Sequence, residues 1–254
     1  MTYLHQLLSN KPGMYNKVSF LFKVSKEFLH CNIYRSKFLP TFLIPYNALF
    51  TDQHLIFNNL NVEKDPAKAL NQILKSYQLF KTIYTDGSKS SHGCGFGIFI
   101  NDSPTSISEK IHPSSSIFTA ETSAISFALD IIIKKKWEKA LILTDSLSAI
   151  ISLFQNGLDS TMHPYIAEIK GKIYRLRQVG SDIKIMWIPG HKNIHGNEQA
   201  DSLAKKSCNI PSNADDVHIV VQDIFPSFKE KMNKDSAFSY KNYFGPNKKL
   251  KGEK

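Results

Sequence analysis

The stretch IYTDGSKSSHGCGFGIFI, residues 83–100, places Asp86 after an apolar run and follows it with Gly87 and Ser88. An aspartate before a glycine is a common turn signal, so this pair by itself predicts a turn that ends a strand. LTDS, residues 143–146, ends a second apolar run in the same way with Asp145. If the two strands are parallel neighbours, both carboxylates lie at one edge of the sheet, about 4.8 Å apart.

The rest of residues 80–210 predicts the sheet to which these strands belong. TIYT (82–85), GFGIFI (95–100) and SISEKI (106–111) indicate three short antiparallel strands, and ALILT (140–144) and IKIMWI (183–188) indicate two more. Helical patterns over residues 118–136, 146–155, 163–178 and 197–206 give the order β-β-β-α-β-α-α-β-α. This order predicts an α/β fold with a mixed five-stranded sheet, an antiparallel hairpin edge plus parallel strands, and helices on both faces.

The first helix carries the clearest packing signal. With Thr119 as the expected cap, its apolar positions fall on one face: Ala124, Ile125, Ala128, Leu129 and Ile132. That apolar face of the helix requires a sheet to cover.

Three glycines alternate in the second strand at positions 93, 95 and 97, which indicates close approach of a backbone or helix.

Two further acids join Asp86 and Asp145 as metal-ligand candidates. Glu121 lies in the first turn of the first helix and Asp201 in the last helix, and each alone has an ordinary explanation as a helix charge. Aspartates held close together repel each other and raise at least one pKa, unless a divalent cation neutralises them. Four acids together predict a site for a pair of Mg²⁺ ions, about 3.5 to 4 Å apart.

The motifs YTDGS, TAE, LTDS and IPGHKNIHGNEQADSLA, in this order, resemble the type 1 ribonuclease H domain. The wording of FTAE and WIPGHKNIHGNEQAD is most similar to the ribonuclease H domains of jockey-like non-LTR retrotransposon reverse transcriptases. The resemblance covers about residues 80–210. It implies a ribonuclease H-like fold and a two-metal endonuclease that cleaves the RNA strand of RNA/DNA hybrids, with Mg²⁺ as cofactor and Mn²⁺ as a substitute.

The resemblance and the chemistry assign a role to each acid. Asp86 is expected to bridge both ions, with Glu121 and Asp145 on the ion that activates water and Asp201 on the ion that stabilises the departing oxygen. His191 lies ten residues before Asp201 in a polar loop, where it is expected to transfer protons or assist product release.

Three other residues are expected to contact substrate: Gly87, Ser88 and Asn197. Gly87 and Ser88 follow the first metal ligand directly, where a 2′-hydroxyl can be sensed. A competing interpretation takes His191 and His195 as zinc ligands at HxxxH spacing, but the segment supplies no third soft ligand.

The charge favours a polyanionic partner. The net charge is +10, of which residues 1–79 carry +5 from nine basic and four acidic residues, residues 80–210 carry +3 and residues 211–254 carry +2. The basic and aromatic residues of segment 1–79 make it either a handhold for the duplex or a connector that packs on another domain. No stretch predicts a membrane span or secretion signal, so an intracellular protein is expected, in nucleus or cytoplasm. Cys31, Cys94 and Cys208 are expected to be buried thiols.

Two features depart from the family pattern. The interval between Asp145 and His191 is too short for the extra basic helix that grips hybrids in cellular enzymes, and carries only a few basic residues before its strand: Lys170, Lys172, Arg175 and Arg177. Ile117 and Phe118 replace polar residues that hold substrate in many members. Both features predict weak substrate affinity.

The chain is therefore predicted to have three parts: an N-terminal connector-like segment (1–79), a ribonuclease H-like domain (80–210) and a C-terminal extension (211–254). Residues 1–79 are too few for a polymerase, so the chain is expected to derive from a retrotransposon polyprotein, with a reverse transcriptase domain upstream. The alternative to an active enzyme is a non-catalytic nucleic-acid-binding remnant of such a retroelement.

Overall fold

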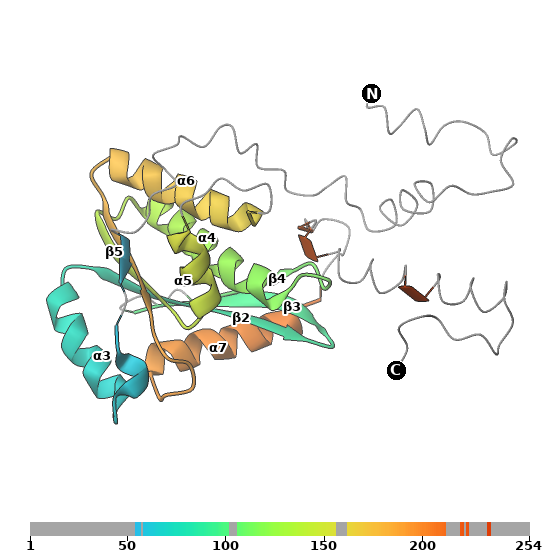
Figure 1. Cartoon of the computed structure of the whole chain (residues 1–254), viewed down its shortest axis with the longest axis horizontal. Coiled ribbons are helices and arrows are strands. Elements are labelled where there is room, and N and C mark those ends of the chain that lie inside the picture. Colours follow the sequence, from blue (N-terminus) through green and yellow to red (C-terminus); the bar gives the residue numbers. More distant parts are fainter. Residues whose placement is uncertain are drawn as a thin grey trace, which may run out of the picture.

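A mixed sheet forms the centre of this computed structural model, which describes residues 54–56, 58–101, 106–155, 162–211, 219–220, 222–223 and 233–234 (Figure 1). The sheet has six strands in the order β1-β6-β5-β2-β3-β4. Their bounds are Leu55–Ile56 (β1), Lys81–Ser90 (β2), Gly93–Ile100 (β3), Ser106–Ile111 (β4), Lys139–Thr144 (β5) and Asp182–Trp187 (β6). Strands β2, β3 and β4 are antiparallel, whereas β1, β6, β5 and β2 are parallel.

Helices cover both faces of the sheet (Figure 1). One face packs on α4 (Ile117–Lys135), α5 (Leu147–Phe154) and α6 (Pro164–Gln178), and the other on α7 (His195–Cys208), α3 (Pro66–Leu74) and the short helix η5 (Leu60–Val62). A second short helix, η6 (Lys75–Tyr77), follows α3. Alternate residues of a strand point to opposite faces, so Ile83 belongs to the first core cluster and Tyr84 to the second. The five predicted apolar positions of α4 are fully buried, as expected.

The predicted α/β fold and the predicted order of elements from β2 to α7 are confirmed. All five predicted strands are present, and the two-residue strand β1, from outside residues 80–210, adds a sixth beside β6. Residues 54–79, predicted as part of a connector, thus supply β1 and α3, with Leu60 and Leu70 buried against the sheet. The boundary at residue 79 stays a prediction, and residues 1–53 lie outside the described residues.

Two local predictions are wrong. The strand does not turn at Asp86: Asp86 pairs with Gly97 and Gly87 with Phe96, and β2 continues to Ser90. It is only the parallel ladder with β5 that stops, at Thr85 opposite Thr144. The start of α4 is capped by Ser116, which accepts from the Thr119 amide at 3.1 Å, rather than by Thr119 itself.

The alternating glycines of β3 allow α7 to lie directly on the strand. A Cβ at Gly97 would collide with the backbone at Ala200 and Ala204, and one at Gly95 would collide with Ser207. The predicted close approach of a helix is therefore confirmed. It fixes α7, and with it Asp201, over the middle of the sheet.

The described residues include no helix long and apolar enough to cross a membrane. Cys94 and Cys208 are buried free thiols, as predicted, and Cys31 lies outside the described residues. Beyond α7, the described residues Ile219, Val220 and Asp223 are buried.

Candidate active site

Three carboxylates converge where β2 and β5 lie side by side. Asp86 and Asp145 follow the paired residues Thr85 and Thr144, so the predicted arrangement of parallel neighbouring strands is confirmed. Glu121 comes from the first helical turns of α4. One ligand oxygen of each acid lies within 4.8 Å of the others, which is a spacing at which one cation can contact several of them.

Gly87 permits the approach of Glu121. A Cβ on Gly87 would lie 2.7 Å from the Glu121 amide nitrogen and 3.0 Å from the Ala120 carbonyl carbon. Any larger residue would push the start of α4 away from the strand, since a Cβ that close to backbone requires movement. Gly87 therefore has a packing role in the site, and its predicted contact with substrate stays a prediction.

Asp201 completes the group from the opposite face of the sheet. It lies on α7, where its carboxylate pairs with Lys205 at 2.6 Å. Its charge is close enough to Asp86 to contribute to the raised pKa of that acid. Asp86, Glu121 and Asp145 thus meet where the parallel pairing of β2 and β5 ends, and Asp201 lies near Asp86, although the four acids are far apart in the sequence.

Burial and mutual repulsion raise the pKa values of Asp86, Glu121 and Asp145. Burial, followed by the charges of Asp145 and Asp201, raises the pKa of Asp86 to about 8. Burial, followed by the charges of Asp86 and Asp145, raises the pKa of Glu121 to about 9. The pKa of Asp145 is also raised, chiefly by burial. The negatively charged form of such buried carboxyl groups is unfavourable unless a positive charge lies close to them.

The donor set fits a divalent metal ion. Glu121 Oε2 is buried and, among the described residues, has no hydrogen-bond partner. Carboxylate oxygens are the ligands that hard cations such as Mg²⁺ prefer. A cation between Asp86, Glu121 and Asp145 would satisfy this oxygen and relieve the repulsion at once.

Asn197 holds one of the acids in place. It is buried at the start of α7, and its Nδ2 donates to Asp145 Oδ2 at 3.2 Å. Trp187 Nε1 donates to the backbone oxygen of Asp145 at 3.1 Å. The structure thus gives Asn197 a positioning role, while its predicted contact with substrate stays a prediction.

The loop between β6 and α7 borders Asp145. A Cβ at Gly190 would lie 2.6 Å from Asp145 Oδ2. The next residue, His191, is exposed with a backbone φ of 54°, and its charge lowers the pKa of Asp145. His191 is therefore beside the acids and open to solvent, whereas the helical His195 packs edge-on against Phe99.

Ser88, the third predicted substrate contact, and the residues that depart from the family pattern differ in how far they are exposed. Ser88 lies two residues after Asp86 on the same side of β2 and is partly buried. Lys170 and Lys172 are buried, so they are not free to grip a duplex, whereas Arg175 and Arg177 are exposed at the end of α6. Ile117 is exposed at the start of α4, beside the partly buried Phe118.

Sequence reasoning missed Lys205 and the docking of Asp223. Lys205 follows Asp201 by four residues, a spacing that brings helical side chains together and that the sequence displays. Thr119 Oγ1 donates to Asp223 Oδ2 at 2.7 Å and lies 3.0 Å from His163 Nε2. No sequence signal connects Thr119 with a residue 104 positions later, since only folding brings them together.

Comparison with known proteins places this arrangement in a family. The family model described as RNase H matches residues 79–209, about half of the chain. The chain belongs to the RNase H family. This RNase H chain is also 30% identical over 125 residues to the Pol polyprotein of equine infectious anemia virus (strain Wyoming), a match that covers 49% of the chain and 10% of that polyprotein. The chain thus spans about a tenth of the length of that relative.

Solved RNase H structures overlap half of the chain. An N-terminal RNase H domain from Mycobacterium tuberculosis, solved as a fusion with maltose-binding protein, is 20% identical with a TM-score of 0.39, covering 50% of this chain and 98% of that one. RNase H1 from the halophilic archaeon Halobacterium salinarum is 19% identical with a TM-score of 0.38, covering 50% and 96%.

Proposed function

We propose that this RNase H family member is an Mg²⁺-dependent endonuclease that cleaves the RNA strand of RNA/DNA hybrids. One observation carries the proposal: Asp86, Glu121 and Asp145 bring ligand oxygens within 4.8 Å of one another. The pKa of Asp86 is raised to about 8 and that of Glu121 to about 9. Such a cluster is unfavourable for a purely structural role and favourable for holding divalent cations.

Asp86, Glu121, Asp145 and Asp201 would hold two Mg²⁺ ions, or Mn²⁺ in their place. When bound, the ions supply an activated water and neutralise charge at the scissile phosphodiester. Asn197 keeps Asp145 oriented through the hydrogen bond of 3.2 Å. His191, exposed beside Asp145, would move protons between the site and solvent or assist product release, and Ser88 would sense the 2′-hydroxyl of RNA.

The proposed biological context is a retroelement polyprotein. The Pol polyprotein relative supports this context, and the wording of FTAE and WIPGHKNIHGNEQAD favours a jockey-like retrotransposon. In that context a reverse transcriptase domain lies upstream and the protein acts inside the cell. The N-terminal segment, the RNase H domain over residues 80–210 and the C-terminal extension would then be parts of a longer enzyme.

The test is cleavage of an end-labelled RNA/DNA hybrid by the full chain in Mg²⁺. We expect cuts in the RNA strand alone, with 5′-phosphate and 3′-hydroxyl ends, and no cleavage in EDTA or of double-stranded DNA. Asp145→Asn is the matched control, because the amide keeps the shape of the side chain. A parent protein that binds the hybrid but cuts it with neither Mg²⁺ nor Mn²⁺ would support the alternative, a non-catalytic nucleic-acid-binding remnant.

A further inference from the structure

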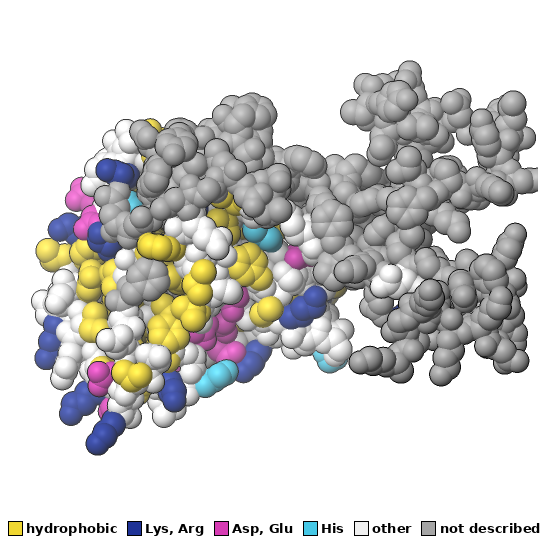
Figure 2. Space-filling view, viewed as in Figure 1, with side chains coloured by type: hydrophobic (Ala, Val, Ile, Leu, Met, Phe, Trp, Pro, Cys, Tyr) yellow, Lys and Arg dark blue, Asp and Glu magenta, His cyan; other side chains and the backbone are white. Residues whose placement is uncertain are grey.

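Lys205 places a positive charge beside the acids. Its Nζ lies 2.6 Å from Asp201 Oδ2, one helical turn along α7. The charges of Asp86 and Glu198 also act on its ammonium. On the face seen in Figure 2, acidic side chains gather in one group with basic and histidine side chains beside it. Lys205 is itself exposed and pairs with Asp201.

The ammonium satisfies a carboxylate that is partly withdrawn from water. The side chain of Asp201 is 20% exposed, and its charge acts on the buried Asp86. Without a cation nearby, the negative charge of Asp201 would add to the repulsion within the cluster. Lys205 therefore places positive charge beside Asp201, where a metal ion would also be favoured.

The ion pair between Lys205 and Asp201 is weak and can be exchanged for another contact. The Lys205 side chain is 62% exposed, and an exposed ion pair at i,i+4 contributes little, about 0 to 1 kcal/mol. Because an ammonium has no fixed coordination geometry and sits on a flexible stem, Lys205 can leave Asp201 without disturbing α7. The buried Asn197 cannot do this, because its amide is fixed against Asp145.

We propose that the Lys205 ammonium is the exchangeable counter-ion of Asp201. A divalent metal displaces this ammonium from Asp201, and the ammonium then contacts a phosphate of the bound hybrid. This inference rests on the proposed function, since it requires metal at Asp201. It assigns the protein a basic substrate contact next to the acids. Lys170 and Lys172, by contrast, are buried in α6.

The first test measures metal affinity by calorimetry, with Mg²⁺ and Mn²⁺ titrated into the full chain. Lys205→Gln removes the competing charge, so we expect metal to bind about two- to fivefold more tightly than to the parent. Lys205→Arg keeps the charge and should restore the parental affinity. Lys206→Gln is the matched control: the neighbouring lysine is exposed on the same helix, and its loss should leave the affinity unchanged.

The second test measures the binding of the RNA/DNA hybrid. In the Lys205→Gln variant we expect KM for the hybrid to rise about two- to fivefold, with the slope of log affinity against log salt reduced by about 0.9, as for one lost phosphate contact. A merely structural lysine would not move metal and hybrid affinity in opposite directions.

The outcomes separate this inference from the proposed function. Equal metal affinity in the parent and Lys205→Gln, both folded by circular dichroism, would overturn the role of Lys205 while leaving the enzyme intact. Tighter metal binding with an unchanged KM and salt slope would overturn the phosphate contact. If no metal binds the folded parent, the proposed function fails and this inference fails with it.

Discussion

Asp86 links the pH dependence of stability to the proposed metal site. Burial and two neighbouring carboxylates raise its pKa from 3.8 to about 8. Between these values the folded protein binds more protons than the unfolded chain, so metal-free stability falls as pH rises from about 4 to about 8. We expect Asp86→Asn in EDTA to raise the melting temperature at pH 8 by about 2 to 8 °C, and to abolish cleavage in Mg²⁺.

Melting curves at pH 5 and pH 8 check this prediction, because the gain should shrink at pH 5, where Asp86 already carries its proton. Glu109→Gln, an exposed acid on β4, serves as the control and should change neither the melting temperature nor its pH dependence. Equal gains in both variants would show that loss of any one carboxylate charge, and not relief of repulsion at Asp86, is responsible.

His191 offers a second prediction at this scale. If it transfers protons beside the acids, His191→Ala should lower kcat about 10²- to 10⁴-fold, because assistance of this kind supplies such a share of catalysis. Calorimetric metal affinity should stay at the parental value. Asn193→Ala is the matched control, since Asn193 lies in the same loop and has the same φ of 54°. Loss of metal binding by His191→Ala would mean that the histidine is a ligand.

At the scale of elements, the packing of α7 on β3 carries Asp201 to the site. Gly97→Ala should destabilise the protein by about 1 to 3 kcal/mol or more, because the new methyl group meets helix backbone that cannot move aside. Gly171→Ala, within α6, meets no atom within 4 Å and should stabilise by about 0.4 to 1 kcal/mol. Urea unfolding of both variants checks the prediction, and a neutral Gly97→Ala would show that α7 can lift from the sheet.

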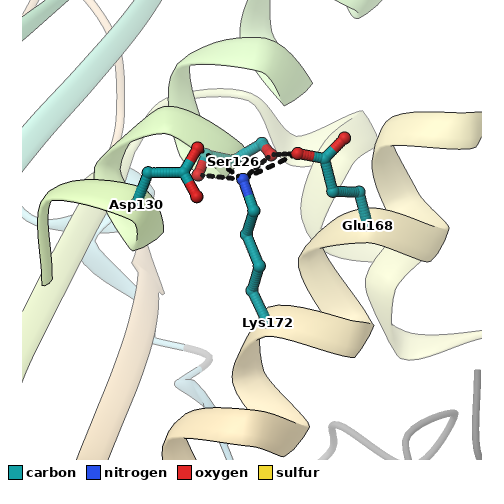
Figure 3. A network of polar contacts seen from close by, with 4 residues as sticks. All are labelled: Ser126, Asp130, Glu168 and Lys172. Atoms are coloured by element: carbon teal, nitrogen blue, oxygen red, sulfur yellow. Dashed lines mark hydrogen bonds and ion pairs between the residues drawn. The ribbon is translucent and has the colours of Figure 1, made fainter. Parts of the chain in front are cut away.

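A buried lysine ties α6 to α4 on the opposite face (Figure 3). Lys172 Nζ lies 2.7 Å from Glu168 Oε1 and 2.6 Å from Asp130 Oδ2, and donates to Ser126 Oγ at 2.8 Å. Lys172→Met should cost about 3 to 5 kcal/mol of unfolding free energy, because it leaves acids without their cation. The exposed Arg175→Met on the same helix should stay within about 0.5 kcal/mol.

A double variant separates charge from packing in that network. If an uncompensated carboxylate causes the loss, adding Glu168→Gln to Lys172→Met should recover part of the stability. No recovery would assign the loss to packing of the lysine stem. Chemical denaturation of the four proteins in the cycle gives the answer.

At the scale of the whole molecule, the N-terminal segment divides into two parts. Residues 1–53 hold six basic and two acidic residues, whereas residues 54–79 supply β1 and α3 with buried Leu60 and Leu70. If residues 1–53 are a handhold, deleting them should weaken hybrid binding and reduce the salt slope by several units, at about 0.9 per contact. Cleavage at saturating hybrid should persist.

Deletion of residues 1–79 is compared with the shorter deletion because it also removes β1 and α3. It also removes the edge strand and two buried leucines, so we expect a further loss of about 3 to 6 kcal/mol. Binding measured on the shorter deletion therefore reports on the handhold, and melting of the longer one reports on β1 and α3. A salt slope unaffected by loss of residues 1–53 would favour the connector interpretation.

The sequence alone determined the order of elements from β2 to α7, because hydrophobic periodicity is local and survives without knowledge of partners. It also indicated the four acids, since Asp86 and Asp145 follow similar apolar runs that parallel pairing brings together. It did not indicate that β2 continues past Asp86, because the pairing of Gly87 with Phe96 is made by another strand. Nor did it indicate β1, whose two residues are too few for a periodic pattern.

Only the tertiary structure decided which groups surround the acids. The hydrogen bond of Asn197 to Asp145, the collision that reserves position 87 for glycine and the contact of Thr119 with Asp223 all join residues distant in sequence. The same holds for the raised pKa of Glu121, which is caused first by burial and then by the charges of Asp86 and Asp145. Propensity and spacing are properties of neighbours along the chain, whereas burial and charge coupling arise only when distant segments exclude water together.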